Sequence, residues 1–177
     1  MSWPAQHIEH MSDHTTARQK PVRVEVRALV MDPVSHMPVV ILQQPERNAY
    51  LPIWIGVCEA NAIALRLEHV ATPRPMTHDL IHNLLGATRH VVEQVLIHSL
   101  NDSVFLASIR LRDPSGAVTE VDARPSDAIA IALRADAPVL VQPAVLDQAE
   151  VQEASEEETL RLMLERLRPE DMGRYEM

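Results

Sequence analysis

The chain has 177 residues, of which 46% are hydrophobic and 23% charged, and its formal net charge is −9. This size fits one globular domain with a single core, and the acidic excess argues against a protein that holds nucleic acid through a broad basic surface. The single cysteine leaves no partner for an intramolecular disulfide, and no apolar run approaches the roughly 18 residues of a membrane helix, so we expect a cytoplasmic protein that does not enter membranes.

The first half of the chain begins with a segment that lacks any pattern and continues with short strands. Residues 1–20 show neither helical nor strand periodicity, and we expect a mobile leader. Apolar residues then alternate through residues 22–30, as in a strand with one buried face. Two β-branched runs follow at residues 38–43 and 49–55, so the three strands should form a meander, with Pro52 placing the third at an edge or a bulge.

Helix formers follow the meander, and the strand pattern then returns. Two helices are predicted, at residues 59–70 and 77–85, with prolines between them. The later predicted elements are strands 89–100, 104–112 and 117–121, a helix 125–134, a strand 138–142 and a terminal helix 155–168.

Two of the predicted helices have nearly the same sequence. Residues 59–66 and 127–134 are identical at six of eight positions, and each segment follows three predicted strands. We therefore predict an α+β fold with mixed or antiparallel sheets, built from a duplicated βββα unit with an inserted helix and completed by a C-terminal helix. Chance similarity between two helices rich in Ala and Ile is the alternative. The predicted domain spans residues 21–146, and residues 147–177 form an acidic tail.

Polar residues gather where predicted strands end and helices begin. Helix starts present unpaired N–H groups and a partial positive charge, so a phosphate oxygen can bind there beside an arginine. The residues in question are Glu59, Arg74, His78, Asp79, Asp122, Arg124 and Asp127. A carboxylate in a first helical turn is also favourable by about 0.3–1 kcal/mol without any ligand, which is the purely structural interpretation of these acids.

Two further residue types resemble functional groups but have simpler interpretations. His78 and His82 share one face of a predicted helix at the spacing of paired zinc ligands, yet no Glu follows the first His, which favours surface or capping histidines. Cys58 lies among Val57, Ala60 and Ala62, which favours a small buried residue over a nucleophile.

Three sequence motifs make the chain similar to a known family. They are LPIWIG at 51–56 followed by Glu59-Ala60, RPMTHD at 74–79, and DARPSDAIA at 122–130. In these motifs, and in their order and spacing from about residue 22 to 141, the chain resembles the bifunctional nuclease domain family. The resemblance implies an α+β fold, self-association and the nuclease activity on DNA and RNA reported for plant members. The turn at residues 34–37 departs from the family because it lacks the glycine that relatives often carry.

The chemistry of phosphodiester hydrolysis suggests roles for the polar residues. Carboxylates holding Mg²⁺ or Mn²⁺ and an arginine suffice to position water and neutralise the charge that develops on phosphate. We predict Asp79, Asp122 and Asp127 as metal ligands and, with His78 as general acid or base, as the catalytic residues. Arg74, Arg124 and Glu59 are the predicted substrate-binding residues, with DNA or RNA as substrate and a homodimer or higher homo-oligomer as the assembly.

The same residues also fit a protein without catalytic activity. In a binding or assembly module they would form a network of ion pairs between the two repeat units, with Arg124 paired to Glu59 and Arg74 paired to Asp127. The two interpretations differ in whether these side chains converge in an open cleft or are sealed in mutual pairs.

Overall fold

The computed structural model describes residues 20–47 and 49–153, with side chains in the last helix as far as Ala149. This part of the chain forms seven strands and four helices, which confirms the predicted α+β class. Among the described residues, no helix is long and apolar enough to cross a membrane. The predicted mobile leader and the terminal helix at 155–168 lie outside the described residues, apart from Lys20.

The first three strands form the predicted meander. They are β1 (Val22–Met31), β2 (Pro38–Gln44) and β3 (Ala49–Trp54), paired antiparallel in sequence order. In β1, Val24 and Ala28 are buried and Arg23 and Glu25 are exposed, as the alternation predicted. The strand that holds Pro52 is an edge strand, which confirms the position inferred from that proline.

A second antiparallel meander follows later in the chain. It consists of β4 (Val91–Asn101), β5 (Val104–Arg112) and β6 (Val118–Ala123). Asp102 and Ser103 have φ values of 47° and 63°, the left-handed backbone of a tight two-residue hairpin. Gly116, with φ of 89°, lies in the turn between β5 and β6, so both predicted hairpins are present.

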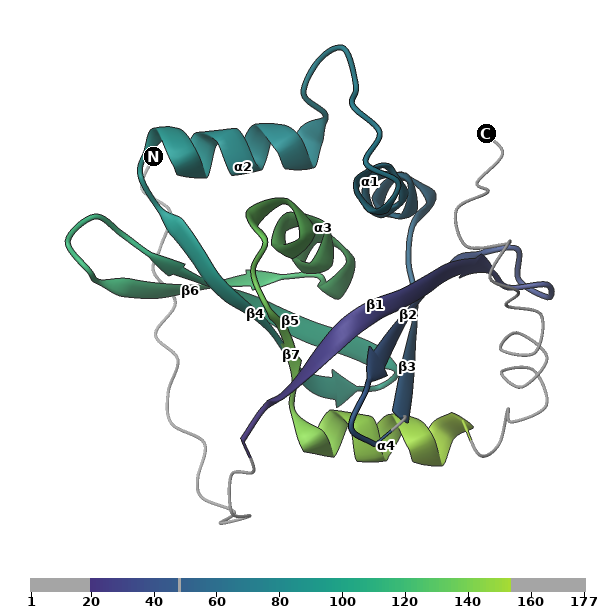
Figure 1. Ribbon diagram of the computed structural model, residues 1–177. Coiled ribbons are helices and arrows are strands. Elements are labelled where there is room, and N and C mark those ends of the chain that lie inside the picture. The colour runs from purple at the N-terminus through teal and green to yellow at the C-terminus, as the bar shows by residue number, and fades with distance from the viewer. Residues whose placement is uncertain (1–19, 48, 154–177) are drawn as a thin grey trace, which may run out of the picture.

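A three-residue strand joins the two meanders. β7 (Val139–Val141) pairs antiparallel with β1 and parallel with β4, giving the order β3-β2-β1-β7-β4-β5-β6. Each meander therefore runs outward from β7 in its own chain order, as Figure 1 shows. This arrangement is what a duplicated βββα unit would produce, although the duplication itself stays a prediction.

Three helices cover one face of the sheet and one helix covers the other. α1 (Val57–Leu67), α2 (Thr77–Ala87) and α3 (Pro125–Ala135) lie together on one side, and α4 (Pro143–Glu153) lies on the opposite side (Figure 1). Pro125 occupies the first turn of α3, where its missing N–H costs no hydrogen bond. α1 and α3 pack against each other, and α2 packs on α3.

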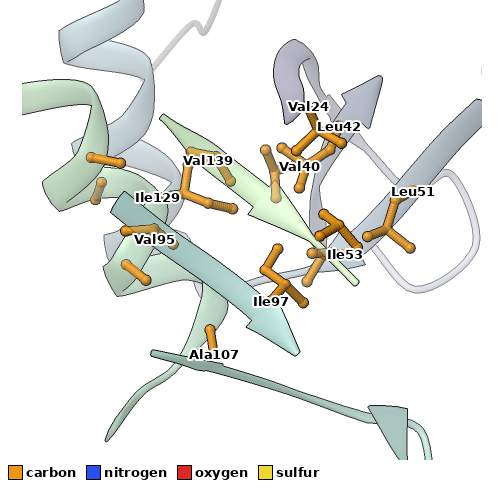
Figure 2. Packing of buried hydrophobic residues seen from close by; sticks show 14 of the residues in the cluster. Val24, Val40, Leu42, Leu51, Ile53, Val95, Ile97, Ala107, Ile129 and Val139 are labelled. Carbon is orange, nitrogen blue, oxygen red and sulfur yellow. The ribbon is translucent and has the colours of Figure 1, made fainter. Parts of the chain in front are cut away.

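The core lies between the helices and the sheet and is made mainly of Val, Ile, Leu and Ala. Figure 2 shows Ile129 of α3 near Val95 and Val139, with Ile53 and Ile97 further along the same apolar layer. All five of these side chains are buried. Aliphatic packing of this kind matches the low aromatic content of the chain.

Helix α4 was not predicted from the sequence. Val145, Leu146 and Ala149 are buried, so this helix is part of the core. The boundary placed after residue 146 therefore falls inside a helix that continues to Glu153. Of the residues assigned to the acidic tail, those up to 153 belong to α4.

The turn between β1 and β2 is held by a buried carboxylate. Asp32 accepts hydrogen bonds from the Ser35 hydroxyl (2.5 Å), the Val34 N–H (2.9 Å) and Trp54 Nε1 (3.0 Å). These bonds, led by that of Ser35, lower the pKa of Asp32 from 3.8 to about 2. His36 has φ of 56° in this turn, the left-handed conformation that glycine adopts at less cost.

Because Asp32 has a lower pKa folded than unfolded, it should stabilise the protein above pH 4 and lose that contribution as pH falls from 3.8 toward 2. The Asp32→Asn variant should unfold at neutral pH with a free energy about 1–2 kcal/mol below wild type. Urea unfolding of both proteins at several pH values checks this. A difference that stays constant down to pH 2 would contradict the assignment.

Candidate functional site

Helices α1 and α3 lie side by side and run in the same direction. Their first turns meet at Arg124, the residue that precedes α3. Their last turns meet where Arg66 Nε of α1 donates to the Leu133 carbonyl of α3 at 2.9 Å. The repeated segments thus place Glu59 and Asp127, which occupy equivalent positions, at the same end of the pair.

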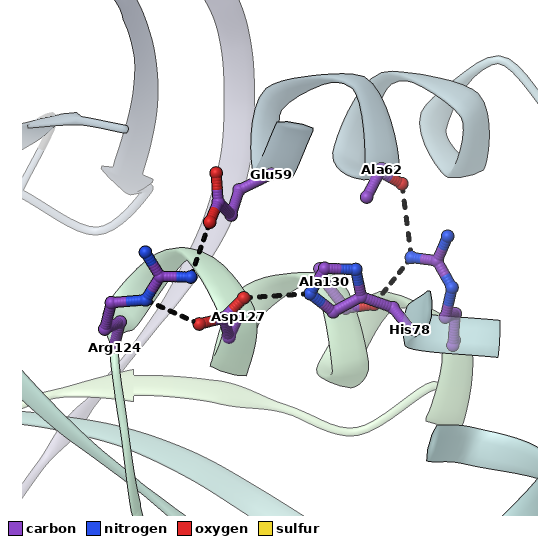
Figure 3. A network of polar contacts seen from close by, with 7 residues as sticks. Glu59, Ala62, His78, Arg124, Asp127 and Ala130 are labelled. Atoms are coloured by element: carbon purple, nitrogen blue, oxygen red, sulfur yellow. Dashed lines mark hydrogen bonds and ion pairs between the residues drawn. The ribbon is translucent and has the colours of Figure 1, made fainter. Parts of the chain in front are cut away.

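Arg124 links the starts of these two helices. Its Nε donates to Asp127 Oδ2 at 2.8 Å and its Nη2 to Glu59 Oε1 at 2.5 Å, as drawn in Figure 3. The pairing of Arg124 with Glu59 that the sequence suggested is therefore present. The Arg124 side chain remains 66% exposed, so these contacts do not remove its guanidinium from solvent. The two carboxylates, Asp127 first, raise the pKa of Arg124 above its ordinary value.

Asp127 also contacts a histidine of α2. His78 Nε2 lies 3.0 Å from Asp127 Oδ1, and the His78 side chain is 9% exposed (Figure 3). Burial would raise the pKa of Asp127, but hydrogen bonds from Arg124 and His78 outweigh it and lower the pKa. Asp127 is thus ionised and has one oxygen on the arginine and the other on the imidazole.

The position of Glu59 depends on a glycine. A Cβ at Gly56 would lie 2.3 Å from Glu59 Oε2, so a larger residue there would push the carboxylate out of its place. Gly56 directly precedes α1 and has ordinary extended dihedrals. Glycine suits this position because it leaves space for the Glu59 carboxylate, and not because the backbone takes a conformation that other residues avoid.

Asp79, the residue next to His78, faces a different partner. It accepts hydrogen bonds from Arg134 Nε (2.5 Å) and from the Met76 N–H (2.8 Å). Arg134 is only 6% exposed, and its Nη1 also donates to the Ala62 and Ala130 carbonyls. Burial would raise the pKa of Asp79, but the bonds from Met76 and Arg134 lower it overall.

The linked side chains of Glu59, His78, Arg124 and Asp127 form the Arg124 cluster. An open cleft of about 740 Å³ lies beside it. Five of the seven residues proposed from the sequence line it, namely Glu59, His78, Asp122, Arg124 and Asp127. Asp122 is exposed on β6. Asp79 lines a second cleft of about 510 Å³ instead, and Arg74 lies in the loop before α2, with its carbonyl bonded to the Thr72 hydroxyl. The expected pair between Arg74 and Asp127 is wrong, because Arg124 and His78 occupy the Asp127 carboxylate.

First-turn residues of α1, α2 and α3 line this same cleft. They include Glu59 of α1, Thr77 of α2 and Asp127 of α3. Each helix start carries a partial positive charge of about half a unit. Three such ends offset much of the net negative charge that Glu59, Asp122 and Asp127 leave beside the single arginine.

The cleft also contains residues that sequence reasoning interpreted differently or missed. Cys58 is exposed and lines the cleft, so the expectation of a small buried residue is wrong. Its position at the start of α1, next to Glu59, was the available signal. One wall of the cleft is apolar and comes from helices and strands far apart in the sequence, which no local pattern indicated.

The hydrogen bonds made by the three predicted carboxylates do not leave all three available to hold one divalent cation. Asp79 is bonded to Arg134 and Asp127 to Arg124 and His78, which leaves Asp122 as the carboxylate without a hydrogen-bonded cation. Within residues 20–47 and 49–153, no three His, Cys, Asp or Glu side chains group closely enough to hold a metal ion. A role for Mg²⁺ or Mn²⁺ stays a prediction.

Comparison with known proteins identifies the family of the chain. The family model described as "Bifunctional nuclease domain" matches residues 40–154, which include every residue of the Arg124 cluster. Two uncharacterized proteins of Mycobacterium tuberculosis, from strains CDC 1551 and H37Rv, are each 43% identical over 126 residues, which cover 71% of this chain and 74% of theirs. The chain therefore belongs to the bifunctional nuclease domain family.

Proposed function

We propose that this chain hydrolyses phosphodiester bonds of DNA or RNA in the cleft beside Arg124. The observation that carries the proposal is the convergence of Arg124, Asp127 and His78 in one open cleft, although these residues come from two helices far apart in the sequence. Three helix starts at the same place favour a bound phosphate. The family description points to the same kind of substrate.

In this proposal His78 is the general base. Asp127 binds Nε2 of the imidazole, so Nδ1 is the nitrogen that can take the proton of an attacking water. A new P–O bond then forms as the bond to the leaving sugar oxygen breaks, and that oxygen takes a proton from solvent. Asp127 fixes the orientation of the ring and stabilises its protonated form.

Arg124 is the phosphate contact. Its Nε and Nη2 are used by the two carboxylates, which leaves Nη1 for a phosphate oxygen. Glu59, itself 12% exposed, keeps the guanidinium at the mouth of the cleft and acts as a positioning residue. In the same proposal Asp122, which lines the cleft from β6, orients the attacking water.

A binding or assembly module without catalysis is the second candidate. It is favoured by the continuity of the ion-pair cluster, which ties α1, α2 and α3 together through Glu59, Arg124, Asp127 and His78. If this were the role, loss of Arg124 would chiefly weaken the fold. Its 66% exposure argues for a small effect, because exposed ion pairs contribute about 0–1 kcal/mol.

We further propose that the protein acts in the cytoplasm as a homo-oligomer. The free thiol of Cys58 suits a reducing compartment. Leu80 and Leu84, 53% and 56% exposed on one face of α2, provide an apolar surface for a second copy. Light scattering of the purified chain measures its mass in solution, and a monomer at micromolar concentration would contradict the oligomer.

Cleavage of labelled single-stranded RNA and DNA by the purified full chain tests the proposed function. Arg124→Gln should lower the rate by about 10²-fold, because it removes the cation that neutralises the phosphate. Arg112→Gln is the matched control, since Arg112 lies outside the cleft and pairs with Glu93. Equal rates in wild type and Arg124→Gln would mean a contaminating nuclease, and a parallel reaction with EDTA shows whether a metal is needed.

A further inference from the structure

The lining of the cleft beside Arg124 is of two unlike kinds. Part of it is charged or polar and includes Arg124, Asp127 and His78. Another part is apolar, and its six large aliphatic side chains, here called the apolar wall, are Ile81, Leu85, Ile109, Leu111, Val121 and Ile131. The role of the charged residues in phosphodiester cleavage does not explain this wall.

The apolar wall is assembled from four elements rather than from one surface stripe. α2 contributes Ile81 and Leu85, β5 and β6 contribute three side chains, and α3 contributes Ile131. Val121 is 42% exposed on the edge strand, so part of the wall faces solvent. A flat apolar group laid on this wall would remove that surface from water, which is favourable.

We propose that the apolar wall is a subsite for one nucleobase, which leaves the stack of a single-stranded chain while Arg124 binds the adjoining phosphate. This inference rests on the proposed function and names its substrate class. The volume of about 740 Å³ lies in the range of about 300–1,000 Å³ typical of small-molecule pockets. A base that is paired and stacked in a duplex cannot reach such a wall without being extruded.

The charge of the cleft is that expected of a site that binds a short stretch of nucleic acid. Arg124 is the one arginine or lysine among the described residues that line it. Each phosphate neutralised on a single strand contributes about −0.7 to the slope of log binding constant against log salt. A short oligonucleotide should therefore bind with a slope near that of one or two phosphates.

The single cysteine provides a direct measure of what occupies the cleft. Cys58 is exposed, lines the cleft and is the only cysteine in the chain, so a maleimide reacts there alone. Adenosine 5′-monophosphate should slow the labelling at a concentration at least about 10-fold lower than inorganic phosphate, because only the nucleotide covers the wall. A single-stranded decanucleotide should likewise protect at lower concentration than the same strand in a duplex.

A matched pair of variants on β6 tests the wall itself. In Val121→Asn, the nucleotide should protect Cys58 from labelling no better than inorganic phosphate does. In Val118→Asn, the roughly 10-fold difference between their protecting concentrations should remain. Val118 is 38% exposed on the same strand and does not line the cleft, so both variants change an exposed edge valine. Neither substitution removes a buried side chain, so both proteins should fold.

The outcomes separate this inference from the proposed function. Equal protection by phosphate and nucleotide, or equal effects of the two valine variants, would overturn the base subsite and leave cleavage at Arg124 standing. A preserved nucleotide preference without cleavage of any substrate would support the subsite and remove the nuclease. Tighter protection by the duplex than by the single strand would overturn the single-stranded assignment.

Discussion

Replacing His78 with Ala should lower the rate of phosphodiester cleavage by about 10²–10⁴-fold, the usual contribution of a general acid or base. The reason is the 3.0 Å contact that aims the imidazole from α2 at Asp127 and places it in the cleft. The measurement is single-turnover cleavage of a labelled strand across pH. His82→Ala is the control, because His82 lies one turn further along α2 and lines the second cleft.

Asp127→Asn extends the same prediction. If Asp127 orients the His78 ring, the variant should lose activity to a similar degree, and the double variant should be no worse than His78→Ala alone. Independent losses that multiply in the double variant would contradict a shared role. A loss in His82→Ala equal to that in His78→Ala would assign the effect to α2 as a whole.

Replacing Arg134 with Ala should lower the free energy of unfolding by about 1.5–3 kcal/mol, the contribution of hydrogen bonds to charged groups, because the partner carboxylate of Asp79 is 32% exposed. Arg134 is 6% exposed, and its loss would deprive Asp79 and the Ala62 and Ala130 carbonyls of their donor. Urea unfolding followed by circular dichroism measures the change. The matched variant Arg124→Ala should lower the same quantity by no more than about 1 kcal/mol.

The contrast between the two arginines decides between catalysis and architecture. A large stability loss in Arg124→Ala with unchanged cleavage would favour the assembly module. Adding Asp79→Ala to Arg134→Ala should recover part of the lost stability, because the unpaired carboxylate is then removed. No recovery in the double variant would show that the carbonyl contacts of Arg134 matter more than its ion pair.

Local sequence patterns predicted most of the described elements because each strand or helix carries its own periodicity. The alternation through β1, the turn residues of the two hairpins and the proline at the start of α3 are signals confined to a few neighbouring residues. Helix α4 lacked such a signal, since Val145, Leu146 and Ala149 form only a short apolar group. Its burial depends on the opposite face of a sheet that the local pattern does not describe.

The site was predicted in part for a related reason. Arg124 and Asp127 were found because polar residues interrupt the apolar pattern where a strand ends and a helix begins, and the repeat added Glu59 as the equivalent of Asp127. His78 and Asp79 are neighbours in sequence, but successive helical residues point about 100° apart, so one reaches Asp127 and the other Arg134. Which of them faces the cleft depends on how α2 rotates against α3, and the sequence carries no local sign of that angle.

The three residues of β7 have a consequence for how the protein is made. They are the link between the inner edges of two half-sheets, and they come after α3 in the chain. In a ribosome-bound chain that ends before Val139, β1 and β4 would both have unpaired backbone groups along those edges. Such groups can form hydrogen bonds with a neighbouring nascent chain. The sheet can therefore close, and so be protected from aggregation, only after β7 has left the ribosome.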